Sequence, residues 1–138
     1  ADNDHGTVTD TRTRLMWQKC AYGQTGSGCT GTPLAFTWQG ALNKVQSINL
    51  DGSLIYDNWR LPNLKELISI VEFSCNQPAI DSNIFPNTGY APIYWSSTPS
   101  FNTNEGALKV FFENGEFGWE VKSTALQIRL VRDLPPTL

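Results

Sequence analysis

The sequence predicts an α+β domain in which two helices pack on one side or at one end of a compact antiparallel sheet. Apolar residues recur at helical spacing in the first half of the chain, whereas strand and turn signals dominate from residue 74 onward. Between the two predicted helices, residues 57–63 form an extended segment followed by a sharp corner. The 138 residues suffice for one domain with a sizeable core, and we assign residues 1–138 to it.

The composition favours a loop-rich protein that is not a general nucleic-acid binder. Hydrophobic residues make up 40% of the chain and charged residues 17%, and there are 11 glycines and 8 prolines. The formal net charge of −3 argues against the general basic face that phosphate contacts require, and it leaves a local basic patch open. No apolar run is long enough to cross a bilayer, so we expect no direct membrane insertion. The sequence starts at Ala1 rather than Met, which indicates a processed protein or an excised domain.

The cysteines predict one disulfide and no metal site. Cys20 and Cys29 bracket a glycine-rich loop that has little else to order it, so we expect a disulfide that contributes about 2–3 kcal/mol. The alternative is a pair of reduced thiols in a cytosolic protein. Cys75 is expected to be a buried thiol. Because the only histidine, His5, lies near a terminus and no Cys-x-x-Cys unit is present, we expect no metal and no cofactor.

The first elements are two short strands and a long helix. Residues 7–10 and 15–18 are predicted to form a hairpin, and residues 20–36 the loop that the disulfide would tether. A helix is predicted to begin at Thr37 because five apolar residues share one helical face, namely Trp38, Ala41, Leu42, Val45 and Ile48. Residues 49–58 are predicted to form a loop.

The second helix is predicted from the residues at the end of the extended segment 57–63. Pro62 fixes its own φ and keeps the preceding residue out of the helical region. Asn63 can cap a helix with its side-chain oxygen, and Glu66 has the spacing of a capping box. We therefore predict a helix over residues 64–73 whose buried face consists of Leu64, Leu67, Ile68 and Val71.

The second half of the chain predicts strands. Residues 74–92 are irregular, with three expected anchors, Ile80, Ile84 and Phe85. Strands are predicted over 93–97, 107–113, 116–121 and 126–132, with Asn114-Gly115 as a hairpin turn. Alternation assigns one face to Leu108, Val110 and Phe112 and the other to Lys109, Phe111 and Glu113. In the last strand it separates Leu126, Ile128 and Leu130 from Gln127, Arg129 and Val131.

Catalysis is not expected of this sequence. A catalytic nucleophile needs a base and a group that orients the base, and one terminal histidine supplies neither a Ser-His-Asp nor a Cys-His set. Four prominent residues are interpreted as structural, with rings that fill the core and guanidinium groups that bond buried carbonyls or carboxylates. They are Trp59, Arg60, Trp95 and Arg132.

The candidate binding surface lies between residues 101 and 123. Aromatic residues at predicted outward positions, among Asn, Glu and Lys, are typical of a binding surface. The candidates are Phe101, Asn102, Asn104, Lys109, Phe111, Glu113, Phe117, Trp119, Glu120 and Lys122. The alternative is that Phe111 or Trp119 covers a second small core or a contact between subunits.

An ordered set of short motifs covers nearly the whole chain. It consists of Gly6-Thr7-Val8-Thr9-Asp10, Arg14-Leu15-Met16-Trp17-Gln18-Lys19, Thr37-Trp38-Gln39 with Ala41-Leu42, Asn58-Trp59-Arg60-Leu61-Pro62-Asn63, Glu66-Leu67, Pro78-Ala79-Ile80-Asp81, Phe85-Pro86-Asn87-Thr88, Tyr94-Trp95-Ser96-Ser97-Thr98 and Val131-Arg132. Together these motifs resemble the C-terminal domain of Legionella collagen-like protein.

The resemblance implies a C-type-lectin-like fold in which two helices flank a small twisted antiparallel sheet with long loops. It also implies a bacterial surface or secreted protein used in cell adhesion. Collagen-like members of the family bind sulfated glycosaminoglycans. Other members are the variable proteins of diversity-generating retroelements, displayed as receptors whose last strands and loops change.

This chain departs from parts of that pattern. The calcium-binding lectin motifs are missing, and the reactive cysteines of the sulfatase-modifying relatives have no counterpart near the C-terminus. Between residues 101 and 132, four basic residues are balanced by four acidic ones, so a protein or an uncharged sugar fits better than a sulfated glycan.

We therefore expect a non-catalytic ligand-binding or adhesion domain, secreted or at the bacterial surface. Its partner would be a protein or glycan on a host, a phage or a neighbouring cell. By the resemblance, it would be a retroelement-diversified receptor that presents its binding face from the C-terminal strands and loops. The alternative is an oligomerising cap, a homo-oligomer at the end of a collagen-like adhesin that binds sulfated glycans.

Overall fold

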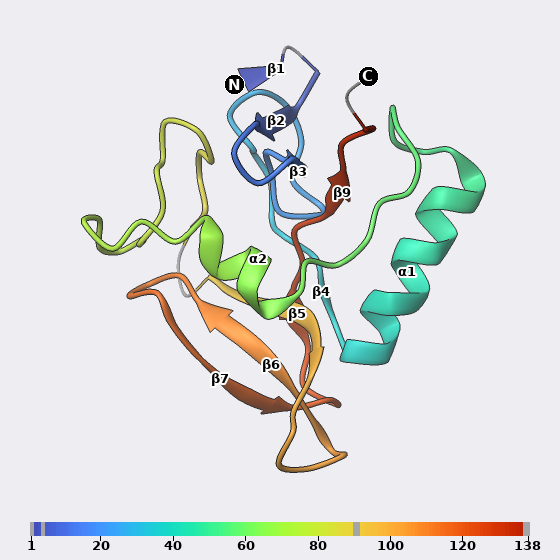
Figure 1. The fold of residues 1–138 in the computed structure, drawn as a ribbon, viewed down its shortest axis with the longest axis vertical. Helices are drawn as coiled ribbons and strands as arrows, with labels where there is room; N and C mark the ends of the chain where they lie inside the picture. The colour runs from blue at the N-terminus through green and yellow to red at the C-terminus, as the bar shows by residue number, and fades with distance from the viewer. Residues whose placement is uncertain (1, 4, 90–91, 137–138) are drawn as a thin grey trace.

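The computed structural model describes residues 2–3, 5–89 and 92–136, and it confirms the α+β class (Figure 1). The two helices are α1 (Trp38–Asp51) and α2 (Leu64–Ser69). The strands are β1 (Asp2–Asn3), β2 (Thr7–Asp10), β3 (Leu15–Gln18), β4 (Ala35–Phe36), β5 (Ile93–Pro99), β6 (Gly106–Phe111), β7 (Glu116–Val121), β8 (Leu126–Gln127) and β9 (Val131–Asp133). Within the described residues, neither helix has the length and apolar character needed to cross a membrane.

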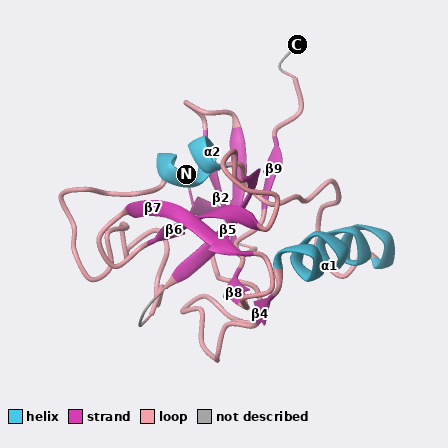
Figure 2. Ribbon diagram, turned by 90° about the horizontal axis from the view of Figure 1, so that it is seen from below, coloured by secondary structure: helices cyan, strands magenta, loops and turns pink. Residues whose placement is uncertain are grey.

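The strands form two sheets rather than the single antiparallel sheet that was predicted. One sheet has the order β1-β2-β3-β9, and the other has the order β4-β8-β5-β6-β7. The second sheet is mixed, because β5 and β8 pair in parallel while its other pairs are antiparallel. Figure 1 shows β6 and β7 below α2, and Figure 2 shows α1 set to one side of this hairpin.

The predicted strand over residues 126–132 is wrong, because the chain leaves one sheet after β8 and enters the other at β9. The four residues from 128 to 131 are all buried, so the expected alternation of inward and outward side chains fails here. A segment that passes between two cores has neighbours on both faces, and period-two patterning then loses its meaning.

Helix α1 begins as predicted but extends further. Thr37 caps it by accepting a hydrogen bond from the Gly40 N–H, and Gly52 ends it with a left-handed φ of 67°. The last turn is therefore helical, where a loop was predicted from residue 49. Asn49 in this turn bonds the backbone of Trp59 at both polar atoms, at 2.9 Å and 2.7 Å. These bonds attach the extended segment 57–63, which contains Trp59, to the end of α1.

Helix α2 has the predicted capping box, with the Asn63 side chain bonded to the Glu66 N–H and the Glu66 side chain bonded to the Asn63 N–H. It ends at Ser69, four residues earlier than predicted. The backbone beyond it bonds elsewhere, because the Glu72 N–H donates to the Ala79 carbonyl instead of continuing the helix. Residues 70–73 therefore leave the helix axis and run over the surface.

This early end corrects the expectation for Cys75. The cysteine is exposed and unpaired, since it lies on the surface segment after α2 and not on a buried face. Cys20 and Cys29 are joined by a disulfide, with 5.2 Å between their Cα atoms. The bond closes the glycine-rich loop between β3 and β4.

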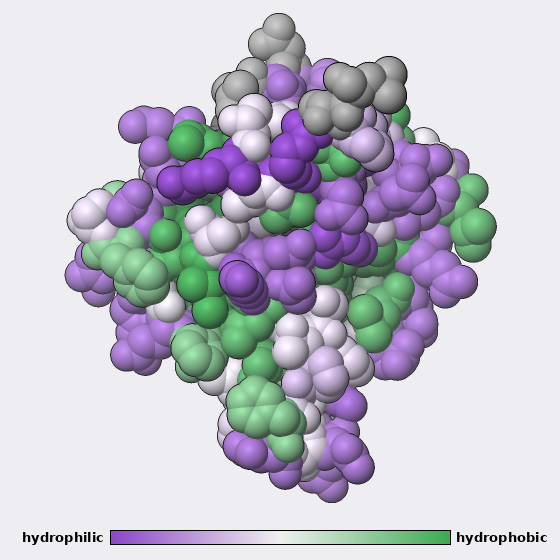
Figure 3. Space-filling view, in the orientation of Figure 1, coloured by the Kyte–Doolittle hydropathy of each residue, from purple (hydrophilic) through white to green (hydrophobic). Residues whose placement is uncertain are grey.

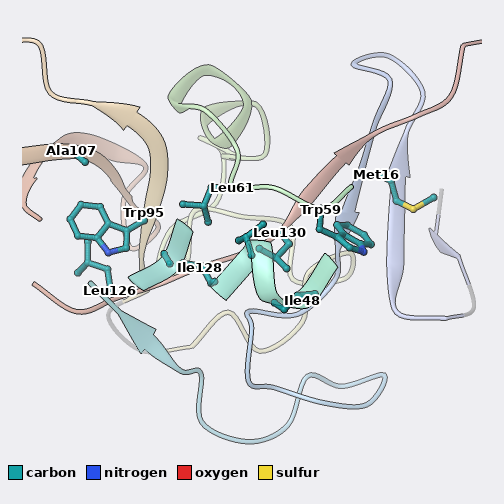
Figure 4. Packing of buried hydrophobic residues seen from close by; sticks show 11 residues of the cluster. Met16, Ile48, Trp59, Leu61, Trp95, Ala107, Leu126, Ile128 and Leu130 are labelled. Carbon is teal, nitrogen blue, oxygen red and sulfur yellow. The ribbon is translucent and has the colours of Figure 1, made fainter. Parts of the chain in front are cut away.

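Two clusters of buried side chains make up the core. The first joins α1 to Trp59, Trp95 and the segment 126–130 (Figure 4). Figure 4 shows Trp95 beside Leu126 at one end of this cluster and Trp59 toward the other. The second cluster joins Leu67 of α2 to Tyr94 of β5 and to Phe112 of the β6–β7 loop. The two helices thus stabilise different cores.

Candidate functional site

The β6–β7 hairpin has a regular register. Leu108 lies opposite Trp119, and Val110 lies opposite Phe117, so these four side chains share one face of the sheet. Val110 belongs to the buried cluster that contains Leu67 of α2. The face that α2 covers therefore continues outward onto β7.

On β7 this face is open to solvent. Phe117 is 60% exposed, Trp119 51% and Val121 40%, whereas Leu108 and Val110 on the neighbouring strand are buried. We call Phe117, Trp119 and Val121 the apolar strip. Figure 3 shows hydrophobic surface on this side of the molecule, below α2 and over the β6–β7 hairpin. Three large apolar side chains in one exposed row are more than the scattered apolar residues of an ordinary surface.

The strip is supported by close contacts with the backbone beneath it. A Cβ atom on Gly106 would lie 2.7 Å from Cε3 of Trp119, so the indole ring lies directly over this glycine. At the other end, a Cβ on Gly115 would lie 2.9 Å from Cε1 of Phe73, whose side chain is 70% exposed. The Phe73 ring therefore adjoins the hairpin turn and adds apolar surface at that end.

Phe111, another of the candidates, does not belong to the apolar strip. It is half-buried, and the register places it on the face opposite to Trp119. The predicted Asn114-Gly115 turn is in fact a four-residue loop over 112–115, because Phe111 pairs with Glu116. Phe112 turns into the core and bonds Pro92 and Ala79 through its backbone, which takes it out of the strand.

Most of the charged candidates are already engaged. Lys109 and Glu120 form an ion pair at 2.6 Å on the face opposite to the strip, and the hydrogen bond from Lys109 lowers the pKa of Glu120 below its ordinary value. Lys122 donates to the Asn104 carbonyl at 2.8 Å, and its ammonium lies 4.7 Å from the centre of the Trp38 ring.

The other candidates lie in loops at the two ends of the hairpin. Phe101 and Asn102 are exposed on the loop between β5 and β6, and Phe101 is 83% exposed. Asn104 is exposed on the same loop, and Glu113 is half-buried in the β6–β7 loop. Of the ten candidates, the structure therefore places Phe117 and Trp119 as exposed neighbours on one face of β7, and it pairs Lys109 with Glu120 on the opposite face of the hairpin.

Sequence reasoning missed Val121 and Phe73. Val121 follows Phe117 and Trp119 at period two, so alternation alone could have found it. Phe73 was assigned to the end of a helix, and no local signal shows that its ring reaches the hairpin turn.

The residues interpreted as structural lie away from the strip. Trp59 and Trp95 are buried, and their indole N–H groups donate to the carbonyls of Tyr56 and Phe36, each at 2.8 Å. Arg132 donates to the carbonyl of Asp57 at 3.0 Å, and its guanidinium carbon lies 4.6 Å from the centre of the Tyr56 ring.

Arg60 connects the capping box to the C-terminal strand. It binds both oxygens of Glu66, at 2.7 Å and 2.8 Å, and one oxygen of Asp133 at 2.9 Å. Burial raises the pKa of Glu66, but the hydrogen bonds from Arg60 and from the Asn63 N–H outweigh it, so the pKa lies below its ordinary value of 4.5.

We expect this cluster to make stability depend on acid pH. A carboxylate whose pKa is lowered by folding stabilises the protein above its unfolded pKa, and this contribution is lost as the pH falls through the folded pKa. Glu66→Gln should therefore lower the free energy of unfolding at pH 7 by about 1 kcal/mol, a modest value because the pair is partly exposed. The difference between wild type and variant should shrink below pH 4.5. Urea unfolding from pH 3 to pH 7 measures it, and a constant difference across this range would contradict the expectation.

Several hollows lie elsewhere on the described part of the surface, and three of them border the disulfide loop or β2. One of about 270 Å³ is lined by Tyr22, Leu34 and Leu130, and one of about 500 Å³ lies on the other side of the disulfide loop beside His5 and Lys19. The third, of about 310 Å³, lies between β2 and the segment after α2. In the described residues no three His, Cys, Asp or Glu side chains are grouped to hold a metal ion.

Comparison with known families gives a match over nearly the whole chain. The family model described as the Lcl C-terminal domain matches residues 6–132, which include both sheets' main strands and the whole apolar strip. No curated protein matches the chain.

Proposed function

Because the chain belongs to the Lcl C-terminal domain family, we propose that it is a non-catalytic ligand-binding or adhesion domain that uses the apolar strip as its contact surface. Its fold is proposed to be C-type-lectin-like, and its location secreted or at the bacterial surface. The single observation that carries the proposal is the row of Phe117, Trp119 and Val121, exposed on one face of β7.

Exposed aromatic side chains in a row are costly unless a partner covers them. Phe and Trp supply a large contact area at low cost in side-chain entropy, and they are enriched where binding energy is concentrated. The Trp119 ring is held over Gly106, so part of its ordering precedes binding. A pre-ordered ring beside further apolar side chains can act as an anchor for a partner.

The charges near the strip favour a protein or an uncharged glycan as the ligand. Lys109 is paired with Glu120, and Lys122 is held by Asn104 and Trp38, so neither presents a free cation to a sulfate group. A sulfated glycan would need a basic excess that this surface does not offer.

Diversification by a retroelement is a separate part of the proposal. It requires a reverse transcriptase gene near the gene for this chain, together with a near-copy of the region that encodes residues 95–132. Sequencing of the genomic neighbourhood tests this part, and the absence of both features would overturn it while leaving the binding surface untouched.

We expect Phe117→Ala/Trp119→Ala to weaken ligand binding by about 30-fold or more, since anchor residues contribute about 2 kcal/mol or more. The measurement is binding to an array of bacterial, host and phage surface proteins and glycans, followed by titration of each hit. The matched control is Leu50→Ala/Ile55→Ala, which removes two exposed apolar side chains outside the strip.

Near-UV circular dichroism and cooperative unfolding establish that both variants are folded. A ligand that binds wild type and the strip variant equally would move the site to the loops or hollows. Sedimentation at high concentration addresses the alternative of an oligomerising cap. If wild type is an oligomer that the strip variant breaks into monomers, and no ligand is found, the strip is a subunit contact.

A further inference from the structure

The register of the β6–β7 pair determines which backbone groups of β7 point outward. The Lys122 N–H donates to the Glu105 carbonyl, so this pair is hydrogen-bonded. In an antiparallel ladder such pairs alternate with pairs that are not hydrogen-bonded. The pair of Leu108 and Trp119 is therefore of the second kind. The Leu108 carbonyl supports this assignment, because it accepts a hydrogen bond from Ser96 of β5 and so points away from β7.

It follows that the residues of the apolar strip direct their own N–H and C=O groups away from β6. Strand β7 is the last strand in the order of its sheet, and among the described residues it pairs only with β6. The Val121 carbonyl accepts a hydrogen bond from the Thr124 N–H, so this carbonyl is already used at that end of the edge. Phe117 and Trp119 thus present two donors and two acceptors that no described residue uses.

This edge lacks the usual protection against pairing with another strand. Native proteins block an exposed edge with proline, lysine, a bulge or a covering loop. Between residues 116 and 121 there is no proline and no lysine, and the register with β6 is unbroken. The charged side chains on the edge are Glu116 and Glu120, and Lys109 already pairs with Glu120. Glu116 is exposed and has no ion pair within the described part of the chain.

We propose that β7 binds an extended peptide of a partner protein by strand addition, with apolar residues of the peptide against the strip and a basic residue beside Glu116. The inference rests on the proposed function, since it takes the strip as the ligand surface. The outward groups of Phe117 and Trp119 repeat at about 6.8 Å, which is the spacing of alternate residues in a strand. A peptide backbone matches this repeat, and its alternate side chains then contact the apolar strip.

The experiment selects dodecapeptides from a random phage-displayed library on the whole chain and then makes the best peptide with a single N-methyl group at each position in turn. We expect methylation at alternate residues to weaken binding by about tenfold or more, because only alternate N–H groups of an added strand point toward β7. Methylation at the residues between them should change binding by less than about threefold. Selected sequences should be apolar at alternate positions and carry a basic residue.

A pair of protein variants tests the same backbone pairing by changing β7 instead of the peptide. Trp119→Thr removes the ring and keeps the outward N–H, whereas Trp119→Pro removes both without breaking a bond to β6. We expect the proline variant to bind the selected peptide at least about tenfold more weakly than the threonine variant. Near-UV circular dichroism and cooperative unfolding establish that each variant is folded.

Three results would overturn strand addition. They are failure to select any peptide, loss of binding without alternation in the methyl scan, and equal binding by the two Trp119 variants. If a glycan or protein from the array still depends on Phe117 and Trp119 in those cases, the proposed function stands and only its mode is wrong. A dimer of this chain that Trp119→Pro alone dissociates would assign the edge to a second copy and also overturn the partner peptide.

Discussion

Replacement of Arg129 by alanine is expected to lower the free energy of unfolding by about 3–5 kcal/mol, one of the two largest effects expected for this protein. The Arg129 side chain is fully buried. Its guanidinium donates to the Lys19 carbonyl and to the Tyr94 hydroxyl, and its central carbon lies 5.0 Å and 5.2 Å from the ring centres of Phe85 and Tyr94. The variant would lose these contacts and leave a cavity between the two sheets.

The charge of Arg129 makes a second substitution informative. No described carboxylate forms an ion pair with it, and its Nε has no hydrogen-bond partner among the described residues. The two aromatic rings therefore supply much of the favourable environment for the cation. Because Arg129→Met fills most of the volume and removes a charge that is costly to bury, we expect it to lose only about 1–2 kcal/mol.

Urea or guanidinium unfolding of the three proteins at pH 7 measures both differences. A methionine variant as unstable as the alanine variant would mean that the hydrogen bonds and the charge, not the volume, carry the stability. An alanine variant close to wild type would contradict the buried position of this side chain.

The second large effect is expected for Trp95→Ala, which should lose about 3–5 kcal/mol, whereas Trp119→Ala should lose about 1 kcal/mol or less. Trp95 is fully buried, contacts the cluster that contains α1, and donates from its indole to the Phe36 carbonyl of β4. Its removal opens a cavity and leaves that carbonyl without this donor. Trp119 is 51% exposed and lies on an edge strand. Much of its surface already contacts solvent, and its removal leaves a space that solvent can fill.

The two tryptophan variants form a matched pair, because the same side chain is deleted from neighbouring regions of one sheet. Chemical unfolding followed by far-UV circular dichroism gives both free energies, since tryptophan fluorescence would change with the mutation itself. The same two proteins enter the binding array. Equal losses of stability would contradict the assignment of Trp95 to the core and Trp119 to the surface.

Several elements follow from local chemistry and were predictable from the sequence. The capping box of Asn63 and Glu66 involves residues three apart, and the buried stripe of α1 repeats at helical spacing. The β7 segment was predicted with its bounds, and alternation identified Phe117 and Trp119 as outward-facing. Each of these signals lies within one helical turn or one strand, so no distant residue is needed to interpret it.

Other features depend on residues far apart in the chain. The end of α2 depends on the bond between Glu72 and Ala79, and the exposure of Cys75 follows from that end. The four-residue length of the β6–β7 loop depends on the backbone bonds of Phe112 to Pro92 and Ala79. Local propensity could not reveal these outcomes because each is decided by a hydrogen bond outside the segment concerned.

The sequence by itself determined the α+β class, the family, the start of α1, the capping box of α2 and the exposed aromatic residues of β7. Only the tertiary structure decided that there are two sheets, that residues 128–131 pass buried between them, and that Arg129 lies between Phe85 and Tyr94. The physical reason is burial on both faces. Where a strand has solvent on one side its side chains alternate, but where two layers enclose it even an arginine can be buried among aromatic rings.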